Sequence, residues 1–106
     1  MSEERIAALQ QLLEQEPNDT MLLFGLANDY HTLGQFAEAI TYFERALTVD
    51  PEYAAVYVRL AWAYEQNNQI DLARKTLERG QGAIERSGDR NLMAESADLW
   101  EQLQDA

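Results

Sequence analysis

The chain has 106 residues, of which 46% are apolar, and its 19 acids against 8 bases give a formal charge of −11. This charge argues against a nucleic-acid partner, because such binding depends on clustered Lys and Arg side chains that neutralise phosphates. The lack of cysteine excludes disulfides, thiolate metal sites and cysteine nucleophiles.

No apolar run approaches the roughly eighteen residues of a membrane-spanning helix, so we expect no membrane partner. The opening residues, MSEERIAALQQ, carry acids where secretion signals carry bases. We therefore expect a soluble protein in the cytoplasm. The excess acid has three interpretations: a well-solvated surface, a basic partner, or adaptation to a salty cytoplasm whose ions screen the charge. The sequence does not separate them.

The first predicted element is a helix over residues 3–15. Its apolar stripe consists of Ile6, Leu9, Leu12 and Leu13, at helical spacing. The helix should end before Pro17, because proline lacks an N–H and restricts the residue before it.

Two further helices are predicted over 20–33 and 36–48, separated by Gly34, a natural helix terminator. The first has one seam of apolar residues: Leu23, Leu26, Ala27 and Tyr30. The second has another: Phe36, Ala39, Ile40, Phe43, Ala46 and Leu47. Each seam follows the period of an α-helix, so we expect the two helices to pack against each other.

The spacing between Pro17 and Pro51, the only prolines, is the period of a repeat that relates this helical pair to the next stretch of chain. At the same spacing, residues 20–50 and 54–84 share these identities: Leu26/Leu60, Ala27/Ala61, Tyr30/Tyr64, Gln35/Gln69, Ala39/Ala73, Glu44/Glu78 and Arg45/Arg79. The repetition predicts a second helical pair over 54–66 and 70–86.

A sixth helix is predicted over 91–104. Its Met93-x₂-Ser96-Ala97-x₂-Trp100 pattern is a weak copy of the apolar seam on the first helix of each pair. The helix carries acids only, whereas the helix before it carries Arg74, Lys75, Arg79 and Arg86, so we expect complementary charge to orient the last helix. Gly80 aligns with Ala46, and we expect the last helix to pack closely against it.

The stretch LFGLANDYHTLGQFAEAITYFERALTVDP resembles a tetratricopeptide repeat, whose signature places small and large residues at fixed offsets within one period. Here the signature reads Leu23-x₂-Leu26-Ala27-x₂-Tyr30, Ala39-x₃-Phe43 and Pro51, then Tyr57-x₂-Leu60-Ala61-x₂-Tyr64, Ala73 and Leu77. The resemblance implies an all-α fold of six helices, with antiparallel helix-turn-helix repeats stacked as a short right-handed solenoid. The single domain would comprise a half-repeat helix (1–17), repeats over 20–53 and 54–87, and a capping helix over 90–106.

Catalytic signatures are missing from the sequence. His31 is the only histidine, and Asp29, two residues away, points to another helix face. One histidine without cysteine makes no transition-metal cluster, and no Gly-rich phosphate loop is present. We expect no enzymatic activity, no cofactor and no metal.

The resemblance implies that the first helix of each repeat lines a concave groove that holds an extended or helical peptide. At about 100° per residue, one strip on these helices lies away from the seam. The predicted groove residues are Phe24, Asn28, His31, Val58, Arg59, Trp62 and Glu65. The predicted function is a protein-binding adaptor or scaffold with a protein or peptide partner.

Three alternatives concern this prediction. One subgroup of the family grips acidic chaperone tails through Lys, Asn and Arg, but Phe24 stands in the lysine slot and Arg59 in that of a second asparagine, which disfavours such a ligand. Trp62 alternatively packs against Phe24 and Val58 and merely fills space. The chain alternatively serves to form a homodimer, with Leu9, Leu12 and Leu13 as the covered edge.

Overall fold

A computed structural model describes residues 2–106, and these residues form six helices without a strand. The helices are α1 (Ser2–Gln15), α2 (Thr20–Thr32), α3 (Phe36–Val49), α4 (Ala54–Gln66), α5 (Ile70–Ser87) and α6 (Arg90–Gln104). The predicted all-α class is confirmed, and no predicted helix end differs from the observed one by more than a single position.

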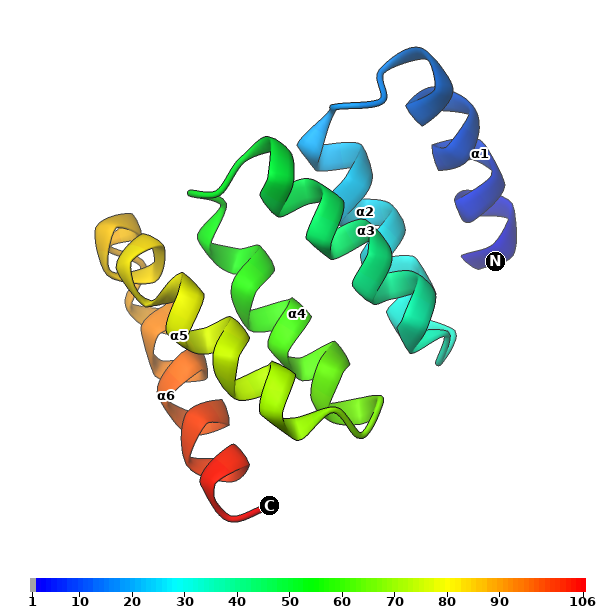
Figure 1. Cartoon of the computed structure of the whole chain (residues 1–106). Helices are drawn as coiled ribbons and strands as arrows, with labels where there is room; N and C mark the ends of the chain where they lie inside the picture. Colours follow the sequence, from blue (N-terminus) through cyan, green and yellow to red (C-terminus); the bar gives the residue numbers. More distant parts are fainter. Residues whose placement is uncertain (1) are drawn as a thin grey trace.

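The helices follow one another across the molecule in sequence order, with α1 at one end and α6 at the other (Figure 1). Helices α2 and α3 pack together, as do α4 and α5. The first helices of successive pairs also meet, since α2 contacts α4 and α4 contacts α6. The result is a stacked helical repeat in which α2, α4 and α6 share one side.

Capping residues fix where the helices begin and end. The Asp19 carboxylate accepts hydrogen bonds from the backbone N–H groups of Met21 and Leu22, at 2.9 and 3.2 Å. Gly34 closes the α2–α3 turn with a φ of +77°. The equivalent turn between α4 and α5 uses Asn68 with a φ of +63°, and asparagine is among the residues that tolerate this left-handed conformation. The turn therefore repeats although its residue changes.

Alanines occupy the helix crossings, as the repeat signature predicts. Ala27, Ala39, Ala61 and Ala73 are all 0% exposed. Larger side chains fill the spaces between the crossings, and the fully buried ones include Leu23, Leu26, Phe43 and Leu60. The core therefore runs through both repeats without interruption.

Gly80 permits a close approach, but to a different helix from the one predicted. A Cβ atom added at Gly80 would lie 2.3 Å from Cγ of Tyr57 in α4. The prediction that α6 packs at this site is wrong. The glycine lies on the face of α5 that meets α4, its own repeat partner, as its counterpart Ala46 lies in the buried face of α3.

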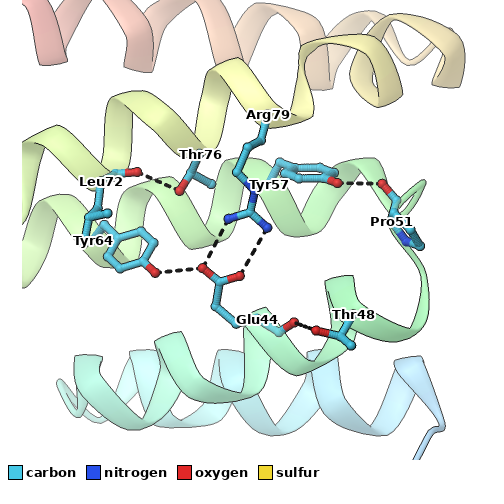
Figure 2. A network of polar contacts seen from close by, with 8 residues as sticks. All are labelled: Glu44, Thr48, Pro51, Tyr57, Tyr64, Leu72, Thr76 and Arg79. Atoms are coloured by element: carbon cyan, nitrogen blue, oxygen red, sulfur yellow. Dashed lines mark hydrogen bonds and ion pairs between the residues drawn. The ribbon is translucent and has the colours of Figure 1, made fainter.

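A polar network joins the two repeats (Figure 2). The Glu44 carboxylate accepts hydrogen bonds from Tyr64 Oη at 2.7 Å and from the two terminal nitrogens of Arg79 at 3.3 and 3.2 Å. One carboxylate of α3 thereby holds one residue of α4 and one of α5. This geometry gives each repeat a specific register on its neighbour.

The bases of α5 therefore do not pair with the acids of α6. Arg79 binds Glu44, and Arg86 binds Glu52 through two hydrogen bonds of 2.7 and 2.8 Å. Within residues 2–106, no base of α5 forms an ion pair with α6. The prediction of complementary charge is wrong because these side chains face the first repeat. Arg74 does reach α6, donating to the Leu103 carbonyl at 2.6 Å, where a helix end favours a cation.

The network predicts that the Tyr64 phenol loses its proton only at strongly alkaline pH. Burial raises the pKa of Tyr64 to about 12, and the hydrogen bond to Glu44 adds to the rise. The neutral phenol thus contributes stability that is fully present below about pH 10, the pKa of an unfolded tyrosine, and is lost as the pH rises toward 12. The difference in tyrosinate absorbance between the parent and Tyr64→Phe should titrate near pH 12. A difference that titrates near pH 10 would mean that the phenol is solvated.

Candidate functional site

An open cavity of about 490 Å³ lies between the C-terminal halves of α2 and α4. It brings together four of the seven predicted groove residues: Asn28, His31, Arg59 and Trp62. Four further residues complete its lining: Thr32, Gly34, Phe36 and Gln66. The first helices of the two repeats thus share one depression, closed at one end by the α2–α3 turn and the start of α3.

Trp62 and His31 form the centre of this cavity. Their rings meet edge to face, with centroids 4.5 Å apart and an interplanar angle of 82°. A hydrogen bond joins His31 Nε2 to Gln66 Oε1, and the His31 ring also packs on Phe36. These contacts hold the indole in one orientation while 39% of Trp62 stays exposed. Trp62 therefore presents a fixed aromatic surface to solvent.

The charge of the cavity is opposite to that of the chain. None of its lining residues is acidic, and Arg59 is its one permanent cation. Arg59 is exposed and, within residues 2–106, forms no ion pair. An unpaired guanidinium beside an aromatic ring suits a carboxylate, a backbone carbonyl or a second aromatic ring.

The other three predicted groove residues do not line the cavity. Phe24 is half-buried, and its ring packs on those of Phe43 and Tyr53, with centroids 5.9 and 5.2 Å away. Val58 is buried in the core at 6% exposure, and Glu65 is half-buried outside the cavity lining. Phe24 and Val58 are thus used for packing, and the open part of the strip is the part that Asn28, His31 and Trp62 line.

Sequence reasoning missed part of the lining for identifiable reasons. The apolar period places Phe36 in the seam of α3, and its position at the first residue of that helix is the signal that it borders the turn. Gly34 is a helix terminator in the sequence pattern, and its turn also borders the cavity. Gln66 lies one turn beyond Trp62 on the same strip.

Three other kinds of feature would indicate a different use of the chain: a metal site, a membrane-spanning helix or an exposed dimer edge. In residues 2–106, no group of three or more His, Asp or Glu side chains is arranged to hold a metal ion. No helix of this part of the chain is long and apolar enough to cross a membrane. The dimer edge predicted on α1 is largely used within the chain, since Leu13 is buried and Leu9 packs on the core, whereas Leu12 is 51% exposed.

Similar folds occur among solved structures. The TPR2B domain of yeast Sti1, in a complex with pHsp70, is 21% identical over 94% of this chain and 80% of that one, with a TM-score of 0.88. The chaperone SycD of Yersinia enterocolitica, in complex with a peptide of the translocator YopD, is 18% identical over 97% and 79%, with a TM-score of 0.91. Protein BPP2914 of Bordetella parapertussis is 25% identical over 93% and 86%, with a TM-score of 0.80.

No curated protein sequence matches the chain. The family model described as tetratricopeptide repeat matches residues 30–86, which is more than half of the chain. This match covers the second half of the first repeat pair and nearly all of the second pair, including the α3–α4–α5 network. The chain therefore belongs to the tetratricopeptide repeat family.

Proposed function

We propose that the chain is a protein-interaction module without catalytic activity, which binds a segment of a partner protein in the cavity between α2 and α4. The observation that carries this proposal is the pairing of a half-exposed, oriented Trp62 with the unpaired Arg59 in a cavity without acids. Tryptophan and arginine are among the residues most enriched at binding hot spots. Both belong to the side of the solenoid on which the first helices meet.

The lining also suggests the chemistry of the bound segment. An apolar or aromatic side chain of the partner would pack on the exposed indole of Trp62. A carboxylate or backbone carbonyl beside it would accept hydrogen bonds from Arg59, and the Asn28 amide would bind the peptide backbone. Because His31 already orients the indole, little freedom is lost when the segment binds.

Two of the structural neighbours support this proposal, since the SycD structure holds a YopD peptide and the Sti1 domain is in a complex with pHsp70. An acidic chaperone tail is the less favoured ligand here. The family position that would hold a lysine carries Phe24, whose ring is engaged with Phe43 and Tyr53. We therefore favour a ligand with one acceptor group beside an apolar anchor over a ligand with several acids.

Trp62→Ala tests the proposal. Affinity capture from the native lysate identifies the partner, and calorimetry with the binding segment of that partner gives the dissociation constant. The substitution should weaken binding at least thirtyfold, about 2 kcal/mol, because it removes the largest exposed anchor of the cavity. The circular dichroism spectrum and most of the melting temperature should be retained.

Trp100→Ala is the matched control, because Trp100 is 37% exposed and lies between α5 and α6, away from this cavity. It should bind the segment like the parent. If Trp62→Ala binds normally, the proposed site is wrong. If it unfolds, Trp62 is a structural residue.

A further inference from the structure

Helix α6 repeats the design of α4, but no helix within residues 2–106 covers it as α5 covers α4. Counted from the first residue of each helix, Ala54 and Arg90, equal positions of α4 and α6 correspond. The α4 seam is at most 9% exposed beneath α5: Tyr57, Leu60, Ala61 and Tyr64. Its counterparts in α6 are Met93, Ser96, Ala97 and Trp100, of which Ala97 is exposed and Trp100 is 37% exposed.

This uncovered seam forms one wall of a groove of about 460 Å³ between α5 and α6. Its second wall comes from α5 and consists of Leu77, Glu78, Gln81, Ile84 and Glu85. Leu77 and Ile84 are almost fully buried and supply apolar surface, while Glu78 and Glu85 are exposed at the rim. No base lines the groove, so it is apolar inside with an acidic border.

The equivalent place between α3 and α4 is occupied by α5. Glu44 of α3 is the repeat counterpart of Glu78, and it binds Arg79 from the helix that covers α4 (Figure 2). Glu78, by contrast, forms no ion pair or side-chain hydrogen bond with any residue of the described chain. A helix that covered α6 as α5 covers α4 would place its counterpart of Arg79 beside Glu78.

We propose that the groove between α5 and α6 binds an amphipathic helix of a partner protein, with its apolar stripe on Met93, Ala97 and Trp100 and an Arg or Lys on Glu78. The acidic border selects the basic side chains of that helix. A second copy of the chain is the poorer occupant. Its exposed helix α1 carries Glu3, Glu4 and Glu14 against Arg5, and the whole chain carries −11, so like charges would meet at the border.

The chain supplies a model ligand, because α5 occupies the equivalent place in the first repeat. The probe is a synthetic peptide with the sequence of residues 70–87, which includes Arg79. The protein is the full chain with Trp62→Phe, which leaves Trp100 as its only tryptophan. Added peptide should shift the Trp100 emission to shorter wavelength and saturate, because the helix covers the exposed indole.

Glu78→Arg should weaken this binding at least tenfold, and an Arg79→Glu peptide should restore most of it on that variant. Glu14→Arg is the charge-matched control on α1, and it should bind like the parent. Ala97→Arg obstructs the groove from α6 without using Glu78, and it should also abolish the shift. Circular dichroism confirms that each variant keeps its helices.

Three results would overturn the proposal. The first is a Trp100 emission shift that does not saturate as peptide is added. The second is equal binding by Glu78→Arg and Glu14→Arg, which would make the attraction a general effect of charge. The third is a Trp100 shift that grows with protein concentration alone, together with a doubled mass in light scattering, which would identify a second copy as the occupant.

Discussion

Phe43→Ala should lower the free energy of unfolding by about 3–5 kcal/mol. Phe43 is the largest of the fully buried side chains, at 0% exposure, and its ring packs on Phe24 of α2. Helix α3 contacts both α2 and α4, so a cavity at this position weakens the stack on both sides. The free energy of unfolding of a native protein is only about 5–15 kcal/mol, so this loss is a large share of it. Urea unfolding followed by circular dichroism measures it.

Val49→Ala is the control for this prediction, because Val49 belongs to the same helix but is 42% exposed. Its free energy of unfolding should change by less than about 0.5 kcal/mol. If Phe43→Ala costs no more than Val49→Ala, α3 does not carry the core that joins α2 to α4.

Gly80→Ala should destabilise the protein by about 1–3 kcal/mol, although alanine is the better helix former by about 1 kcal/mol. The new Cβ would lie 2.3 Å from Cγ and 2.5 Å from Cβ of Tyr57. Of these two atoms, Cβ of Tyr57 is bonded to the backbone and cannot rotate away, so α5 must move away from α4 to remove the clash. The loss should appear as a lower midpoint in urea.

Gly82→Ala should change stability in the opposite direction, by up to about 1 kcal/mol. A Cβ there meets only the guanidinium of Arg86, at 2.9 Å, and this long side chain can swing aside. Thermal melts of the two variants give the comparison. A Gly80→Ala protein that melts above the parent would show that α4 and α5 are not in close contact.

The sequence predicted the helices well because their ends are chemically marked. Pro17 and Pro51 follow the last turns of α1 and α3, Gly34 and Gly88 take left-handed conformations after α2 and α5, and the apolar period between them is regular. Asn68 carries a weaker signal, but the repeat period places the same turn there. Local chemistry thus determines each element, and repetition determines how the pairs stack.

The sequence predicted contacts between helices less well. Arg79 and Arg86 have acids available on both sides of α5, and only the packed structure shows that Glu44 and Glu52 are the ones within reach. Helical angles placed Phe24 and Val58 on the strip with Trp62. Angles do not reveal how far neighbouring helices cover each turn, and both side chains are used for packing.

The central proposal is that the cavity between α2 and α4 holds the partner, and the two tryptophans allow a direct test. Trp62 and Trp100 give separate indole N–H signals in an NMR spectrum of isotope-labelled protein. Titration with the captured partner's segment should shift the Trp62 indole signal and the backbone amides of Asn28, His31 and Arg59, and leave the Trp100 indole unmoved. An unchanged Trp62 signal, with shifts confined to α3 and α5, would contradict the proposal.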